Sequence, residues 1–540
     1  MRPIVFFASL FMAIFFQSAT TFAQEQIFPS GILSFGMETA DKKVTDFMKK
    51  WNIEGGSIAI LKDGRLVYSK GFGYADEAGQ QAVTPYSIFR LASVTKPVTC
   101  IAIMQMVEKG IIKLDDKVFG ATGLLPEYNN LITDNRMRSI TVRHLLKHQG
   151  GWNRKWDSNG KAYSPEFEPT INKKAEITAS EGEYTRKATM DYMAKRKLDF
   201  NPGDSTEYSN FGYFVLGRIL VKKSGLSYEN YLRQNIFEPL GIGSMKIGGD
   251  DANSLAVGEV NYYGGNPYTY SMDMMDAHGG LIASAPALGL IMRSVDKDCP
   301  IGKKLLKPET IDIMFNNNLC WGRSNTYNAY HHNGRLSGAS TYISLGDNGF
   351  SIVALFNRTN SDNDIYSEMY KMMWSLTSNV TIPTHNLYDN DAVLWRVPNA
   401  QYQAKFNEMK GKGYRPAVIE GYTDNGNAYF DVVFRKAEQG FEAFHNLTAE
   451  QYQAKFDELQ KTAYKGWDLA TINNYTLNGN VYYAGVFVKT NKPNWAAKHH
   501  QSEAQFNTSN QQLTAQGYKL VQGSRTILNG KTYIASLFSK

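Results

Sequence analysis

The sequence predicts an α+β domain followed by a domain of three α/β-hairpin repeats. Two β-rich segments, 57–70 and 341–356, each contain a central turn signal (Asp63-Gly64 and Asp347-Asn-Gly), which indicates two hairpins. Helical patterns lie between and after them, at 97–109, 211–224 and 365–376. Strands on both sides of a helical middle predict one sheet that joins distant parts of the chain.

A repeat with a period near fifty residues occupies the C-terminal part. Tyr402-Gln-Ala-Lys-Phe406 recurs as Tyr452-Gln-Ala-Lys-Phe456 and, more loosely, as Phe506 to Asn510. Each copy continues to a tyrosine, then to an Asn-Gly turn and a β-rich run. One helix plus one hairpin is therefore repeated three times, and we expect these units to pack on one another because each seldom buries its apolar face alone.

The first residues are typical of a cleavable export signal. Arg2 precedes an apolar run from Ile4 to Phe16, and small or polar residues end at Thr21-Phe22-Ala23, before Gln24. The run is too short to span a bilayer, and no later segment reaches the length of a transmembrane helix. We therefore expect an exported protein, periplasmic or secreted.

The domain boundaries follow from these patterns. The stretch before the repeats contains Pro383, Pro398 and several Asn and Asp residues, which favours a linker. The expected division is a signal peptide at 1–23, the α+β domain at 24–380, a linker at 381–398, and repeats within 399–540 at 399–447, 448–501 and 502–540.

Composition excludes some classes of function. The 58 Lys and Arg residues against 51 Asp and Glu give a net charge of +7 without any long basic run, which argues against nucleic-acid binding. Three cysteines do not make a disulfide framework. Cys299 and Cys320 are candidates for a pair, whereas Cys100, in an apolar helical stretch, is expected to be a buried small hydrophobe.

No cofactor or metal site is expected. Gly71-Phe-Gly-Tyr-Ala75 lacks the strand, glycine motif and helix of a nucleotide site. His144 and His148 have the i, i+4 spacing of a metal pair on a helix, but no Glu lies between them and no third ligand is evident. We expect them to support the helix.

Ser93 and Lys96 form the first element of a candidate catalytic site. In Leu91-Ala-Ser93-Val-Thr-Lys96 the two side chains are spaced i, i+3 at the start of an amphipathic helix, so that they project from one side of its first turn. A neutral amine can take the proton of the serine hydroxyl, and a cationic amine can polarise it. The helix start also favours developing negative charge.

Two further elements follow in order along the chain. Tyr208-Ser-Asn210 leads into a helix, and His332-Asn-Gly334 precedes the second hairpin. The order S-x-x-K, Y-x-N and basic residue-x-Gly is the signature of penicillin-recognising serine enzymes. From about residue 30 to 377 the chain resembles the class C β-lactamase and D-alanyl-D-alanine carboxypeptidase family of serine hydrolases, which implies an antiparallel sheet flanked by helices, plus a helical region.

The resemblance implies a role for each residue of the three elements. Ser93 would be the nucleophile that becomes acylated, and Lys96 and Tyr208 would transfer its proton. Asn210 would bind the substrate amide. The backbone N–H groups of Ser93 and Arg335, the latter next to Gly334, would form an oxyanion hole.

One residue departs from the family pattern. β-Lactamases and carboxypeptidases carry Lys in the third element, where this chain has His332, whose ordinary pKa near 6.5 leaves it mostly neutral at pH 7. We expect a small peptide, amide or ester substrate that needs no carboxylate partner, cleaved by a peptidase, amidase or esterase. A hydrogen bond to backbone at a strand end is the structural alternative for His332.

Two other functions remain open. The protein could be a true β-lactamase or D-Ala-D-Ala carboxypeptidase. It could instead be a non-catalytic envelope-binding protein that works through its repeats, which resemble a bacterial tandem-repeat module found beside hydrolase domains. In either case we expect the repeats to bind, for instance to a cell-envelope polymer, because they carry no catalytic cluster.

Overall fold

The structure is a computed structural model of the 540-residue chain. It describes residues 27, 29–30, 37–76, 81–153, 169–171, 173–256, 258–360, 362, 364–383, 386–388, 392–424, 427–461, 466–490 and 494–540. The expected signal peptide lies outside these residues. Within them, every helix is too short or too polar to cross a bilayer.

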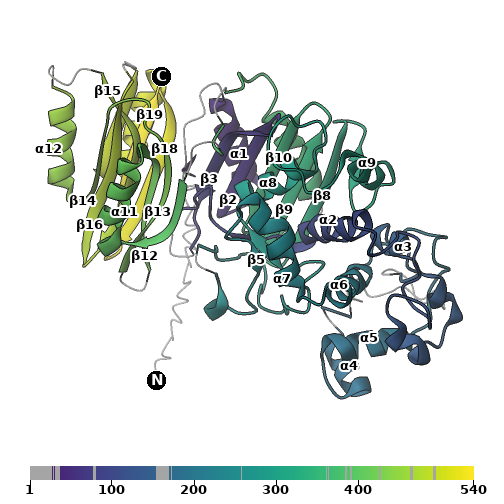
Figure 1. Ribbon diagram of the computed structural model, residues 1–540. Helices are drawn as coiled ribbons and strands as arrows, with labels where there is room; N and C mark the ends of the chain where they lie inside the picture. Colours follow the sequence, from purple (N-terminus) through teal and green to yellow (C-terminus); the bar gives the residue numbers. More distant parts are fainter. Residues whose placement is uncertain are drawn as a thin grey trace, which may run out of the picture.

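A seven-stranded sheet forms the centre of the larger domain, with the order β1-β3-β2-β10-β9-β8-β7 (Figure 1). All of its neighbours pair antiparallel. The strands are β1 (Pro29–Ser30), β2 (Gly55–Lys62), β3 (Arg65–Gly73), β7 (Gly322–Ser324), β8 (Ala329–Leu336), β9 (Ala339–Gly346) and β10 (Phe350–Phe356). The predicted hairpins are β2–β3 and β9–β10, and the pairing of β2 with β10 joins both ends of the domain, as the α+β prediction requires.

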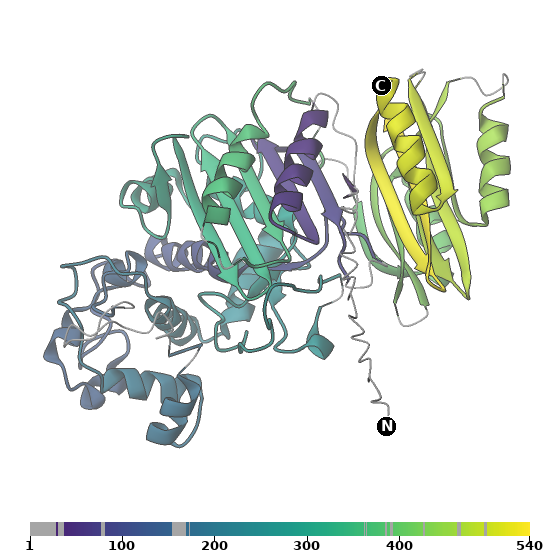
Figure 2. The same cartoon turned by 180° about the vertical axis from the view of Figure 1, so that it is seen from behind.

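Helices cover both faces of this sheet (Figures 1 and 2). On one face, α1 (Glu38–Lys50) and α10 (Asp364–Ser375) enclose a buried apolar cluster that includes Val44, Ile60 and Met369. On the other, α8 (Ala285–Val295) packs on the sheet within a larger cluster. The helical region continues this second core, so the segments between the two hairpins are anchored to the sheet.

The helical region holds the remaining helices of the larger domain. They are α2 (Thr95–Glu108), α3 (Val142–Leu146), α4 (Lys174–Glu181), α5 (Arg186–Ala194), α6 (Asn210–Ser224), α7 (Tyr228–Leu232) and α9 (Pro308–Asn316). The same domain also contains a small sheet of β4 (Phe89–Arg90), β6 (Leu281–Ala283) and β5 (Lys246–Ile247), in that order. The helix bounds at α2, α6 and α10 lie within two residues of those predicted from the sequence.

The C-terminal part consists of three units, each with one helix and three antiparallel strands. The first unit is β11 (Ala392–Pro398), α11 (Asn399–Gly411), β12 (Tyr414–Asp424) and β13 (Asn427–Lys436). The second is β14 (Phe441–Leu447), α12 (Ala449–Leu459), β15 (Trp467–Leu477) and β16 (Asn480–Lys489). The third is β17 (Trp495–Gln501), α13 (Glu503–Ala515), β18 (Lys519–Leu528) and β19 (Lys531–Ser539).

Each unit therefore begins one strand earlier than the expected helix-plus-hairpin copy. The end of the segment assigned to a linker, 392–398, is strand β11, which pairs with β13. Likewise β14 and β17 belong to the unit that follows them rather than to the one before. The partner of each early strand lies beyond the helix, so local sequence does not reveal the pairing.

Polar side chains join the units across their boundaries. Asn473 on β15 accepts a hydrogen bond through Oδ1 from the backbone N–H of Gly421 on β12 at 2.8 Å. Its Nδ2 donates to Ser524 Oγ on β18 at 3.0 Å. Because Asn473 is buried, these bonds satisfy groups that would otherwise be costly to bury, and they link all three units through one side chain.

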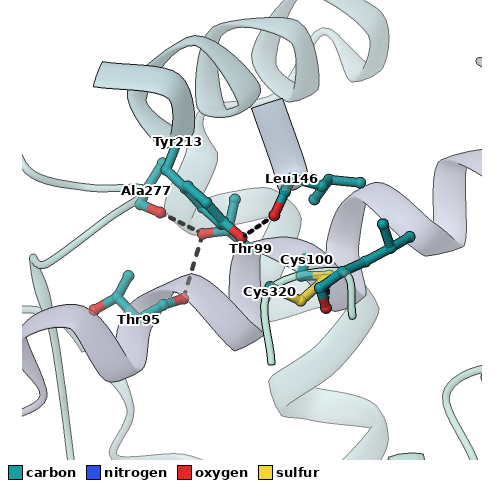
Figure 3. Close-up of a disulfide and its surroundings, with 8 residues drawn as sticks. Thr95, Thr99, Cys100, Leu146, Tyr213, Ala277 and Cys320 are labelled. Atoms are coloured by element: carbon teal, nitrogen blue, oxygen red, sulfur yellow. Dashed lines mark hydrogen bonds between the residues drawn. A yellow bond between two sulfur atoms is a disulfide. The ribbon is translucent and has the colours of Figure 1, made fainter. Parts of the chain in front are cut away.

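The cysteines differ from the sequence-based expectation. Cys100 on α2 forms a disulfide with Cys320, 220 residues further on (Figure 3). Cys299 is the buried free thiol. The prediction that Cys100 is only a buried hydrophobe is therefore wrong, as is the Cys299–Cys320 candidate pair. The segment before β7 packs against α2, which brings Cys320 next to Cys100. A local sequence pattern does not predict such a contact.

Candidate active site

Ser93 lies in a tight turn between β4 and α2. The 3₁₀ turn Ala92–Val94 precedes α2, so Ser93 stands just before the helix rather than within it. Ala92 has φ of 49°, a left-handed conformation that costs a non-glycine residue about 1–3 kcal/mol. The neighbouring Ala92 and Val94 are buried while Ser93 is partly exposed, so the turn presents this side chain to solvent.

Lys96 is fully buried and donates to three acceptors. Its Nζ lies 2.6 Å from Asn210 Oδ1, 2.9 Å from the carbonyl oxygen of His278 and 3.1 Å from Ser93 Oγ. The ammonium also lies 4.7 Å from the centre of the Tyr208 ring. Three acceptors match the three N–H groups of an ammonium, so burial of this charge is compensated.

Tyr208 completes the group around the serine. Its Oη lies 2.7 Å from Ser93 Oγ, so the serine hydroxyl has both the phenol and the amine within hydrogen-bond reach. Ser209 caps α6 by accepting a hydrogen bond from Gly212 N, and Asn210 is the first residue of that helix. The cap fixes where α6 begins and therefore where Tyr208 and Asn210 lie.

Strand β8 runs beside the turn that carries Ser93. A Cβ placed on Gly334 would lie 2.3 Å from the carbonyl oxygen of Leu91 and 3.1 Å from Ala92 Cβ, so only glycine allows this close approach. Thr341 Oγ1 on the neighbouring strand donates to the same Leu91 carbonyl at 2.8 Å. Arg335, next to Gly334, therefore has its backbone beside the serine turn, while its guanidinium is held by the carbonyl oxygen of Asn360.

His332 is partly exposed and lies near the Lys96 charge. Its Nδ1 lies 2.7 Å from the Asn333 carbonyl oxygen, which can only accept, so Nδ1 carries the proton and Nε2 is an acceptor. Removal from water and the charge of Lys96 lower the pKa of His332 to about 3. The imidazole is therefore neutral at pH 7. The hydrogen bond from Nδ1 to the Asn333 carbonyl oxygen is the structural role expected as the alternative for His332.

Some sequence-based expectations for individual side chains are changed. Asn210 Oδ1 accepts a hydrogen bond from Lys96 Nζ, a contact that the sequence does not predict. His144 supports α3 by a capping box with Thr141. His148 does not share that helix, because α3 ends at Leu146. Among the described residues, no three His, Cys, Asp or Glu side chains are grouped to hold a metal ion.

Two groups near the serine have no sequence signal of their own. The His278 carbonyl that holds Lys96 is a backbone atom, which any residue type supplies. The His278 ring is buried, its Nε2 lies 3.0 Å from Thr170 Oγ1, and burial together with the Lys96 charge lowers its pKa well below the usual value. The spacing of His148 from His144 indicates only a metal pair, so the contact of His148 with Tyr208 has no sequence signal either.

Comparison with known families gives two matches. A family described as beta-lactamase matches residues 40–370. A family described as polyglycine hydrolase-like, structural repeat, matches 392–437, 438–490 and 492–540. The second set of bounds coincides with units that begin with β11, β14 and β17.

Curated relatives match over part of the chain. Penicillin-binding protein 4* of Bacillus subtilis strain 168 is 29% identical over 201 residues, 36% of this chain and 38% of that protein. The penicillin-binding protein PbpX of the same strain is 25% identical over 361 residues, 62% of this chain and 80% of that protein. Esterase EstB of Burkholderia gladioli is 26% identical over 245 residues, 43% and 58% respectively. The chain thus spans less than two thirds of the first and the third.

Among solved structures, EstCE1, described as a hydrolase with promiscuous acyltransferase activity, has the same fold. It has a TM-score of 0.50 at 19% identity and covers 63% of this chain and 99% of that one. The family matches and this likeness confirm the predicted fold class: a β-lactamase-like α+β domain followed by three repeats.

Proposed function

The chain belongs to the β-lactamase family, and from that premise we propose that it is a serine hydrolase that cleaves an amide or ester bond through an acyl-enzyme on Ser93. The observation that carries the proposal is the position of Ser93 Oγ, 2.7 Å from Tyr208 Oη and 3.1 Å from Lys96 Nζ. A serine hydroxyl is a weak nucleophile on its own, and a base within hydrogen-bond reach is what activates it.

In the proposed reaction Ser93 Oγ attacks the substrate carbonyl carbon while its proton passes to the Tyr208–Lys96 pair. The pair accepts this proton in the form that holds one proton fewer, with Lys96 as the neutral amine or Tyr208 as the phenolate. The backbone N–H groups of Ser93 and Arg335 stabilise the oxyanion, which the close approach of Gly334 to the serine turn supports. Collapse of the tetrahedral intermediate breaks the bond to the leaving group, which takes the proton. Water then attacks the acyl-enzyme by the same steps in reverse order.

The neutral charge state of His332 favours substrates that have no carboxylate to be bound at this position. A neutral imidazole offers no charge to a carboxylate, whereas a lysine at this place would be a cation. The similarity to an esterase is consistent with an ester or amide substrate. The penicillin-binding relatives keep β-lactams and D-alanyl peptides in the set to be tested.

The test of this proposal is a panel of short esters, D- and L-amino amides, muropeptides and nitrocefin, run with the parental protein and with Ser93→Ala. We expect turnover of at least one neutral ester or amide, lost in S93A. Turnover of nitrocefin or release of D-alanine at a higher kcat/KM than any neutral substrate would favour a β-lactamase or carboxypeptidase instead. Absence of all turnover, with binding unaffected by S93A, would favour a non-catalytic binding protein.

A lysine at position 332 should shift this preference. We expect His332→Lys to raise kcat/KM for nitrocefin relative to a neutral ester by about 10- to 100-fold, the value of a hydrogen bond to a charged group. His331→Lys is the matched control, because His331 is adjacent on β8 and its Nδ1 lies 3.1 Å from Tyr342 Oη, on the other face of the strand. An equal change in both variants, or none in His332→Lys, would contradict the proposed role of this position.

We also propose that the protein is exported and that its repeats dock on a cell-envelope polymer. The N-terminal sequence pattern and the Cys100–Cys320 disulfide support export, because structural disulfides persist in oxidising compartments. The apolar clusters of the repeats lie within the C-terminal units, so the repeats form a module with cores of its own. A separate module supports a binding role distinct from the proposed chemistry. Binding of the full chain to insoluble peptidoglycan, compared with a chain ending at residue 388, tests the docking role, because Leu387 and Tyr388 still pack on the larger domain.

A further inference from the structure

We propose that His148 is a positioning residue for Tyr208, acting through its carbonyl oxygen, its ring nitrogen and its ring face. The inference rests on the proposed function, because it matters only if Tyr208 takes part in proton transfer at Ser93. No contact of His148 with substrate is implied.

His148 holds the backbone on both sides of Tyr208. Its carbonyl oxygen accepts a hydrogen bond from Glu207 N at 2.9 Å. Its Nδ1 accepts from Ser209 N at 3.1 Å, so the neutral ring carries its proton on Nε2. One residue therefore binds the amide before Tyr208 and the amide after it.

The imidazole also lies against the phenol. The ring centres of His148 and Tyr208 are 4.5 Å apart with an interplanar angle of 31°, so the two rings are in contact. A tyrosine fixed at both flanking amides and on one ring face has little freedom at its hydroxyl, which lies 2.7 Å from Ser93 Oγ. Since displacement of a reacting group by about 1 Å can cost about 100-fold in rate, such restraint has kinetic value.

The backbone of His148 is itself fixed in a strained conformation. It follows the end of α3 with φ of 57°, in the left-handed region that most residues avoid. The carbonyl oxygen of Leu146, two residues before His148, accepts from Tyr213 Oη at 3.1 Å and from Cys320 N at 3.3 Å (Figure 3 shows Leu146 beside Tyr213 and Cys320). Strained residues persist where neighbouring contacts impose them, and they gather at functional sites.

The test replaces His148 by phenylalanine and by asparagine. Phenylalanine keeps a ring against Tyr208 but offers no acceptor to Ser209 N. Asparagine places Oδ1 at the position of Nδ1 and tolerates the left-handed backbone, but it loses the ring contact, which we expect to contribute less than the hydrogen bond to Ser209 N. With p-nitrophenyl acetate as substrate, we expect H148F to lower kcat about 10- to 100-fold with KM changed less than about threefold, and H148N to retain at least about a third of the parental kcat.

Controls separate positioning from general damage. H144F and H144N make the same changes four residues earlier, where the ring nitrogen binds Thr141 N instead, and should leave kcat unchanged. H148A, which also lacks the acceptor, takes the place of H148F if that variant does not fold. Parental kcat in folded H148F or H148A, or an H148N as impaired as H148F, would overturn the inference. If the parental protein neither turns over esters nor is labelled at Ser93, the proposed function fails instead.

Discussion

Replacing Lys96 by methionine is expected to lower the rate of acylation at Ser93 by about 10²- to 10⁴-fold, the range that a positioned acid or base contributes. Methionine fills a similar volume but cannot donate to or accept from Ser93 Oγ, which lies 3.1 Å from Lys96 Nζ. The rate is measured as the appearance of covalently labelled protein after mixing with a fluorophosphonate. Lys109→Met, at the far end of the same helix, is the matched control and should label at the parental rate.

The losses in labelling rate caused by changes at Lys96 and Tyr208 should not be additive. Tyr208→Phe removes only the hydroxyl that lies 2.7 Å from Ser93 Oγ, and we expect a loss of similar size. If both groups handle the same proton, the double variant will be little worse than the more impaired single variant, because residues that act as a unit are not additive. Fully additive losses would show that the two residues act in separate steps, and a folded K96M with parental labelling would exclude Lys96 from the chemistry.

Removing the disulfide is expected to cost about 2–5 kcal/mol in free energy of unfolding. Cys100 and Cys320 close a long loop, with 220 residues of sequence separation, and both are buried. Because the loop is long, its conformational freedom in the unfolded state is large without the crosslink. The loop includes the segments that carry Tyr208 and Asn210. The variant is Cys100→Ser with Cys320→Ser, compared in urea unfolding.

Cys299→Ser is the control for that experiment, because Cys299 is a buried free thiol. The decrease in the free energy of unfolding should be smaller in this variant than in the double variant. Equal unfolding free energies for the parental protein and the double variant, measured without reductant, would show that the Cys100–Cys320 bond does not form or does not stabilise the native state.

The sequence predicts what depends on local pattern. The hairpins at β2–β3 and β9–β10 contain their own turn residues, and α2, α6 and α10 have their own apolar periodicity, so the sequence predicts where these elements lie. Ser93 and Lys96 are one turn apart, and their proximity follows from that spacing alone. Tyr208 could be placed beside them only through the family resemblance, since 115 residues separate it from Ser93.

What the sequence does not predict depends on tertiary contacts. Strand β11 ends in a proline and follows a segment rich in Asn and Asp, so its pairing with β13 overrides its local character. The Cys100–Cys320 pair and the role of the His278 carbonyl arise from packing between distant segments. The lowered pKa of His332 likewise comes from partial removal of its ring from water and from the charge of Lys96, and the residues next to it in the sequence indicate neither.

The most direct test of the account is to locate the covalent adduct. The protein is treated with a fluorophosphonate and digested, and its peptides are analysed by mass spectrometry. The account predicts one modified residue, Ser93, with no labelling of Ser93→Ala. Folded protein that remains unmodified at Ser93, or that is modified at another serine while Ser93 stays free, would contradict it.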